Sequence, residues 1–158
     1  MDNSVHIIYR NYKNPLNLKI LINLRNFCKK KGIKLYLSNN FKLALKLQLD
    51  GVYLPSFNKS TIYNCFKFKK NFDVIGSAHN VMELNTKIRQ QVKSFFIAPV
   101  FKKKINKLGI YGFLKFRSFT NRELIVLGGV TSEKMNMINF LNAEGFAAID
   151  YFQKKRPL

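Results

Sequence analysis

The sequence predicts an α/β fold built around a parallel sheet, and three observations support this expectation. Short apolar runs rich in β-branched and aromatic residues alternate with stretches in which apolar residues recur at helical spacing. The runs are apolar throughout, as in parallel strands that are covered on both faces. Polar residues follow nearly every run, which favours a barrel, whose strands all end at one mouth, over a doubly wound sheet.

The first half of the chain supplies three predicted strands and two helices. Residues 5–9 (VHIIY) predict a short buried strand. The next helix is expected to be capped by Asn14, to have Pro15 at its first position and to end at the KKKG sequence of 29–32. The other elements expected here are a strand at 34–37, a short helix around Leu43 and Leu47, and a strand at 51–54.

The second half continues the same alternation. A helix is expected to begin at Asn80, because Asn80 and Glu83 have the spacing of a capping box. The remaining elements expected here are helices at 61–68, 110–116 and 131–142, and strands at 73–75, 94–97, 124–127 and 146–149. The whole prediction therefore comprises seven strands and six helices.

The composition is that of a folded protein. With 158 residues, of which 47% are hydrophobic and 14% aromatic, the chain is expected to form one domain over residues 1–158 and not to be disordered. No apolar run reaches the length of a membrane span, and residues 1–9 lack the n-region and h-region of a signal peptide, so a cytoplasmic protein is expected. Cys28 and Cys65 lack the spacing of a metal site or a disulfide scaffold, which predicts reduced thiols.

The charge is strongly basic, with 28 Lys and Arg against 8 Asp and Glu and a formal net charge of +20. Such a charge attracts anionic partners, but the abundance of Asn, Ile, Phe and Tyr offers a second explanation, namely the amino-acid usage of AT-rich codons. Binding of nucleic acid is the less favoured interpretation. The lysine clusters at 29–31, 67–70, 102–107 and 154–156 fall on different parts of a barrel, and no RNA-binding motif occurs.

Four segments at predicted strand ends carry specific patterns. Residues 35–54 (LYLSNNFKLALKLQLDGVYL) follow the pattern liiNDdvdlAlalgADGVHL, and residues 75–80 (IGSAHN) follow SaHs/t. Residues 97–101 (IAPVF) follow GPvf/y, and residues 127–131 (LGGVT) follow iGGIt. These four segments occur in the order typical of the thiamine phosphate synthase and thiazole tautomerase superfamily of small TIM barrels. The chain resembles this superfamily over most of its length. No GxGxxG or GxxxxGK[ST] sequence competes with this interpretation.

The resemblance implies a truncated (β/α)8 TIM barrel. Members of the family have a strand and a helix before the position of Val5 and a helix after the position of Ile149. The expected fold is therefore a parallel barrel that lacks the first β-α unit and the last helix. Such a barrel leaves two strand edges uncovered, so a homodimer is expected.

The resemblance also implies an activity, that of a transferase in thiamine biosynthesis. A pyrimidine diphosphate loses pyrophosphate with the help of Mg²⁺, and the resulting pyrimidine cation is captured by a thiazole phosphate. The residues implied as catalytic are Arg10, Ser77 and His79. Those implied to bind substrate or phosphate are Ser38, Lys102, Lys103, Lys104, Lys107, Gly128 and Gly129. The metal positions are Asn39 and Asn58, where the family has two aspartates.

Several positions depart from the family pattern. Two neutral amides at Asn39 and Asn58 predict weak Mg²⁺ binding, and the alternative is that Asn39 caps a helix and Asn58 turns the chain. Tyr12 stands where the family has a lysine, and lysines replace a threonine-rich phosphate loop. Asp150 falls where a small donor is expected, and a carboxylate repels phosphate.

These departures leave alternative functions open. One is a family member that has lost the reaction and binds another phosphorylated small molecule or a protein partner. The tautomerase activity is less favoured than the synthase activity, because Ala98 and Pro99 stand where that branch has a histidine.

Overall fold

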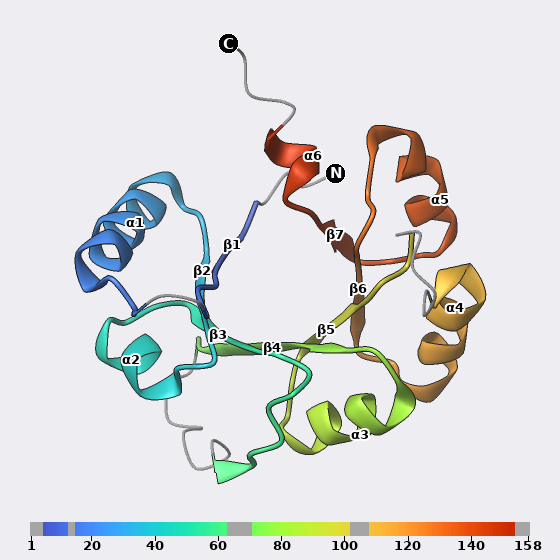
Figure 1. Ribbon diagram of the computed structural model, residues 1–158, viewed down its shortest axis with the longest axis horizontal. Helices are drawn as coiled ribbons and strands as arrows, with labels where there is room; N and C mark the ends of the chain where they lie inside the picture. The colour runs from blue at the N-terminus through green and yellow to red at the C-terminus, as the bar shows by residue number, and fades with distance from the viewer. Residues whose placement is uncertain (1–4, 13–14, 63–70, 102–107, 154–158) are drawn as a thin grey trace.

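A computed structural model describes residues 5–12, 15–62, 71–101 and 108–153 of the chain. Seven parallel strands pair in the order of the sequence and form one sheet. They are β1 (Ile7–Tyr9), β2 (Leu35–Ser38), β3 (Gly51–Leu54), β4 (Asp73–Ala78), β5 (Ser94–Ile97), β6 (Glu123–Leu127) and β7 (Gly145–Ala147). The sheet curls into an open barrel with the helices on its outer side (Figure 1).

The helices follow the strands along the chain. They are α1 (Leu18–Lys31), α2 (Phe41–Lys46), α3 (Val81–Arg89), α4 (Gly109–Phe119), the 3₁₀ helix η2 (Ser132–Lys134), α5 (Met135–Phe140) and α6 (Asp150–Gln153). In the view of Figure 1, α6 lies between the edge strands β1 and β7. Among the described residues, no helix has both the length and the apolar character needed to cross a bilayer.

The core lies in layers on the two faces of the sheet. Between sheet and helices, Phe95, Phe113 and Phe116 are buried in the largest cluster of the described core. On the opposite face, Tyr36 and Phe96 belong to a smaller cluster inside the barrel. Phe95 and Phe96 point to opposite faces because side chains alternate along a strand. The interior is thus filled by side chains, as in the packed core of a TIM barrel.

The predicted fold class is confirmed. All seven predicted strands are present, in sequential parallel order, and among the described residues no pairing joins β7 to β1. The open barrel therefore agrees with the expectation of a truncated TIM barrel. The helix expected at 61–68 falls largely on 63–70, outside the described residues.

Two helix boundaries differ from the prediction. Helix α1 begins at Leu18, with Asn17 as its N-cap accepting a hydrogen bond from the Ile20 amide at 3.1 Å, so Pro15 lies outside the helix. The cap thus lies three residues after Asn14, the residue that the sequence analysis expected in this role. The expected helix at 131–142 is shorter and begins with the 3₁₀ turn η2. Gly32 ends α1 in the left-handed conformation, as the KKKG sequence predicts.

Candidate functional site

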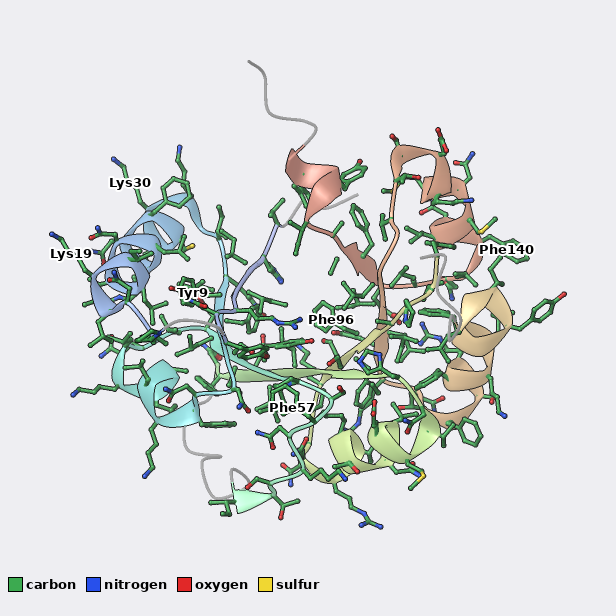
Figure 2. The ribbon with its side chains drawn as sticks, in the orientation of Figure 1. Tyr9, Lys19, Lys30, Phe57, Phe96 and Phe140 are labelled. Carbon is green, nitrogen blue, oxygen red and sulfur yellow. The ribbon has the colours of Figure 1, made fainter. Side chains whose placement is uncertain are left out.

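The described residues of the predicted site gather at one end of the barrel, where the parallel strands finish. They are Arg10 after β1, Ser38 at the end of β2 and Asn39 after it, Asn58 in the turn after β3, Ser77 and His79 at the end of β4, and Gly128 and Gly129 after β6. Lys102, Lys103, Lys104 and Lys107 lie outside the described residues. Figure 2 shows Phe96 within the ring of strands, whereas Lys19 and Lys30 project outward from α1. We call this end the mouth.

Tyr12 joins the turns after the first three strands. Its hydroxyl lies 2.5 Å from the Ser38 hydroxyl, and its ring meets that of Phe57 edge-on with centroids 5.7 Å apart. The Arg10 guanidinium lies 4.8 Å from the centre of the Tyr12 ring, within cation–π distance. The residue that replaces a family lysine therefore contacts the predicted catalytic arginine.

Tyr53 places a buried hydroxyl group directly below the mouth. It is buried, packs edge-on against Phe96 at 5.6 Å, and its side chain is hydrogen-bonded to that of Ser77. Burial raises the pKa of the Tyr53 phenol, while the bond to Ser77 and the charge of Arg10 act in the opposite direction. Tyr53 therefore stays protonated near neutral pH and links β3 to β4 below the mouth.

His79 has a fixed tautomer. Its Nδ1 lies 2.6 Å from the Ala98 carbonyl oxygen, and a carbonyl can only accept a hydrogen bond, so the proton must sit on Nδ1. In the neutral ring, Nε2 is then left as an acceptor. The backbone amide of His79 donates to the Glu83 carboxylate at 2.6 Å, and the Glu83 amide donates to Asn80 Oδ1 at 2.9 Å. The predicted cap at Asn80 is present, with Glu83 reaching one residue further back than in a standard capping box.

Asn39 and Asn58 are brought into direct contact. The Asn58 side-chain Nδ2 donates to Asn39 Oδ1 at 2.6 Å, and Asn58 Oδ1 accepts from the Ser60 amide at 2.9 Å. The Ser60 amide can only donate, so it fixes which end of the Asn58 amide is oxygen. The bond to Ser60 makes Asn58 a turn residue, as the alternative interpretation proposed. Asn39 does not cap the next helix, however, because Asn40 does so and Asn39 has a left-handed φ of 57°.

A buried lysine lies beside this pair. Lys87 of α3 is 0% exposed, and its Nζ donates to the Asn58 carbonyl oxygen at 2.6 Å and to Gln90 Oε1 at 2.9 Å. Gln90 Nε2 in turn donates to the Ser60 carbonyl oxygen at 2.7 Å and lies 3.1 Å from both Asn58 oxygens. Burial lowers the pKa of Lys87 to about 8, and the charge of Glu83 offsets part of that effect.

These contacts decide whether the residues fit Mg²⁺. The side-chain oxygens of both asparagines already accept hydrogen bonds, and an ammonium group lies on the backbone oxygen of Asn58. Mg²⁺ prefers carboxylate oxygens, and in the described part of the chain no three His, Cys, Asp or Glu side chains are grouped to bind a metal. As they stand, Asn39 and Asn58 do not fit a divalent cation.

The turn after β6 is held against the turn after β5. The Val100 amide donates to the Leu127 carbonyl at 3.1 Å, and the Phe101 amide donates to the Gly128 carbonyl at 3.0 Å. Gly128 has φ 94° and Gly129 has φ 75°, and a Cβ on Gly128 would lie 3.3 Å from Pro99. Both glycines are therefore required by the backbone itself, whether or not a phosphate binds there.

Sequence reasoning did not identify Lys87, Gln90 or Tyr53 as members of the site. For Lys87 a signal was present: Leu84 and Ile88 belong to the apolar stripe of α3, and a residue between them at helical spacing faces inward. The contacts of Lys87 with Asn58 and of Tyr53 with Ser77 join different elements, and spacing along the sequence does not show them.

Comparison with known proteins adds family information to this geometry. A family model described as thiamine monophosphate synthase matches residues 4–152. The thiamine-phosphate synthase of Helicobacter pylori (strain HPAG1) is 27% identical over 134 residues, which are 80% of this chain and 61% of the relative. That of Prochlorococcus marinus (strain AS9601) is 26% identical over 155 residues, 92% of this chain and 42% of the relative. The chain thus spans less than two thirds of either relative.

A solved structure agrees with the fold. Thiamine phosphate pyrophosphorylase from Pyrococcus furiosus superimposes with a TM-score of 0.74 at 14% identity, covering 93% of this chain and 72% of the other. At this identity the likeness concerns the fold alone.

Proposed function

The chain belongs to the thiamine monophosphate synthase family, and from this premise we propose that it joins a pyrimidine diphosphate to a thiazole phosphate and releases pyrophosphate. The observation that carries the proposal is the convergence of Arg10, Ser38, Ser77 and Gly128 from four different strands on one mouth. The proposal makes the protein a transferase of thiamine biosynthesis that acts on phosphorylated small molecules, and it assigns the protein to the cytoplasm.

The reaction divides into two steps. The carbon–oxygen bond to the diphosphate breaks, and its electron pair leaves with pyrophosphate. The thiazole ring nitrogen then donates its lone pair to the pyrimidine cation and forms the new carbon–nitrogen bond. Arg10, held on the Tyr12 ring, and the lysines at 102–107 are assigned to the leaving diphosphate. Gly128 and Gly129 leave bare backbone for the phosphate of the thiazole.

Ser77 and His79 are assigned to the pyrimidine. Ser77 is buried against Tyr53, so its position is fixed before substrate arrives. His79 carries its proton on Nδ1, which leaves Nε2 to accept a hydrogen bond from a ring substituent or to take up a proton. Ser38, bonded to Tyr12, completes the side of the mouth formed by β1 and β2.

The activity is tested with the purified chain, a pyrimidine diphosphate, a thiazole phosphate and an assay for thiamine phosphate. We expect turnover, and we expect Arg10→Ala to lower kcat about 100-fold, since a charged donor at a departing oxyanion contributes on that order. Lys19→Ala is the control, because it removes one exposed charge from α1, away from the mouth. Absence of turnover at saturating substrate would contradict the proposal, and equal activity of both variants would contradict the role of Arg10.

Pyrophosphate binding is expected to depend weakly on Mg²⁺ and strongly on salt, because lysines and not carboxylates supply the attraction. Titration calorimetry should show Lys103→Ala/Lys104→Ala weakening pyrophosphate binding more than EDTA does. Lys29→Ala/Lys30→Ala, in the exposed last turn of α1, is the matched control. Loss of binding on chelation together with normal binding by the Lys103→Ala/Lys104→Ala variant would show this assignment to be wrong.

A second function, binding of a phosphorylated ligand without the reaction, is favoured by one observation. The two positions at which the family has aspartates hold neutral amides that bond to each other. Pyrophosphate binding without turnover in the assays above would make this the function of the chain.

A further inference from the structure

The described mouth contains one buried cation that donates hydrogen bonds only to neutral groups. Lys87 is fully buried, and its two hydrogen-bond acceptors are the Asn58 carbonyl and the Gln90 side-chain amide. Glu83, one turn earlier on α3, is the carboxylate that acts on it, while its own oxygen accepts from the His79 amide. Burying an ammonium group without a direct ion pair costs free energy. The presence of a buried lysine at position 87 therefore requires a structural or functional explanation.

The hydrogen bonds run from Lys87 toward the mouth in one direction. Lys87 donates to Gln90, Gln90 donates to the backbone carbonyls of Asn58 and Ser60, and Asn58 donates to Asn39. Each orientation is fixed, because the ammonium can only donate and the backbone carbonyls can only accept. One cation on α3 therefore orders the turn after β3 and, through it, the turn after β2.

These two turns are the ones on which a divalent cation would depend if carboxylates stood at Asn39 and Asn58. We propose that Lys87 is a built-in replacement for that metal, a positioning residue whose ammonium holds both turns of the mouth and makes the site independent of divalent cations. The proposal concerns metal binding and loop order, and only its kinetic readout rests on the proposed function.

Electrostatics gives the proposal a definite consequence. With Lys87 present and two neutral amides, an incoming divalent cation would meet a like charge and no carboxylate to offset it. Aspartates at 39 and 58 would restore the anionic ligands, but the nearby ammonium would neutralise part of their charge. Tight metal binding should therefore need both changes, the gain of carboxylates and the loss of the ammonium.

The test is a set of variants titrated with Mn²⁺, which can be followed by electron paramagnetic resonance without any substrate. We expect no binding by the parent chain at millimolar Mn²⁺ and weak binding by Asn39→Asp/Asn58→Asp. Adding Lys87→Met, which keeps the side chain long but removes its charge, should tighten binding at least tenfold. Lys115→Met in the double-aspartate background, at an exposed position on α4, is the control and should leave the affinity unchanged.

Two results would overturn the proposal: tight Mn²⁺ binding by the parent chain, or equal affinity of the variants with and without Lys87. If the triple variant does not fold, the Lys87→Met variant is tested by amide hydrogen exchange. The Ser60 amide donates to Asn58 within the ordered turn, so its exchange should become faster when Lys87 is replaced. Unchanged exchange there would refute the positioning role. If the parent chain has turnover, EDTA should leave kcat unchanged, and Lys87→Met should raise KM more than it lowers kcat.

Discussion

At the scale of single residues, the mouth combines expected groups in unexpected roles. Tyr12 was identified from the sequence only as the replacement of a lysine, yet it contacts Arg10, Ser38 and Phe57. Asn39 and Asn58 were predicted either as metal ligands or as cap and turn residues, and the structure shows a bonded pair in which only Asn58 has the predicted turn role. At this mouth, the role of a side chain depends on which other side chains it contacts.

The stability of the protein should depend on pH through Lys87. Its pKa is lowered to about 8 in the folded chain, against a usual value of 10.5 in the unfolded one. Below pH 8 both states hold the proton, whereas between pH 8 and about 10.5 the unfolded state holds it and the folded state has released it. The free energy of unfolding contributed by this group therefore rises with pH across that window.

Urea unfolding of the parent chain and of Lys87→Met from pH 7 to 9.5 measures this effect. The difference in unfolding free energy should shift in favour of the parent chain as pH rises. A difference that stays constant over the range would mean that Lys87 does not titrate there. Using the difference cancels the titration of the other lysines and tyrosines, which the two proteins share.

At the scale of elements, helix ends place the residues of the mouth. Asn80 caps α3 by accepting from the Glu83 amide, and Glu83 holds the amide of His79. The same helix carries Lys87 and Gln90 to the turn after β3. The start of α3 thus fixes both the histidine and the buried lysine relative to the sheet.

Removing the cap should therefore cost stability. Asn80→Ala is expected to lower the free energy of unfolding by about 1 kcal/mol, because it leaves an amide of the first turn without its acceptor. Asn85→Ala, on the exposed side of the same helix, is the control and should be neutral or slightly stabilising, since alanine favours helices. Chemical denaturation compares the two, and an equal loss in both would contradict the role of the cap.

At the scale of the whole molecule, the barrel is open among the described residues. Within the described part of the chain, strands β1 and β7 each pair on one side only, and α6 lies between them in Figure 1. Unpaired strand edges favour pairing with a second chain, whereas a net charge of +20 opposes it.

We predict a homodimer whose stability increases with salt, because screening reduces the repulsion between two strongly basic chains. Light scattering at micromolar concentration should give about twice the 18.5 kDa mass of the chain at 0.3 M salt, and less at 0.02 M salt. A mass of one chain under both conditions would refute the prediction. Salt screens all the charges of the chain together, so this test does not distinguish the lysines of α1 from the others.

The sequence by itself determined the strands, most of the helices, their order and the end of the barrel at which the polar residues lie. These follow from local periodicity, from caps such as Asn80 and Gly32, and from the rule that parallel strands end on one side. Only the tertiary structure decided which side chains meet. Lys87 reaches Asn58 across 29 positions and Asn58 reaches Asn39 across 19, because the register of the sheet and the packing of α3 bring them together. The periodicity of apolar residues describes one element at a time. It predicts which face of a helix is buried, but it does not predict which carbonyl oxygen accepts a hydrogen bond from a buried ammonium group.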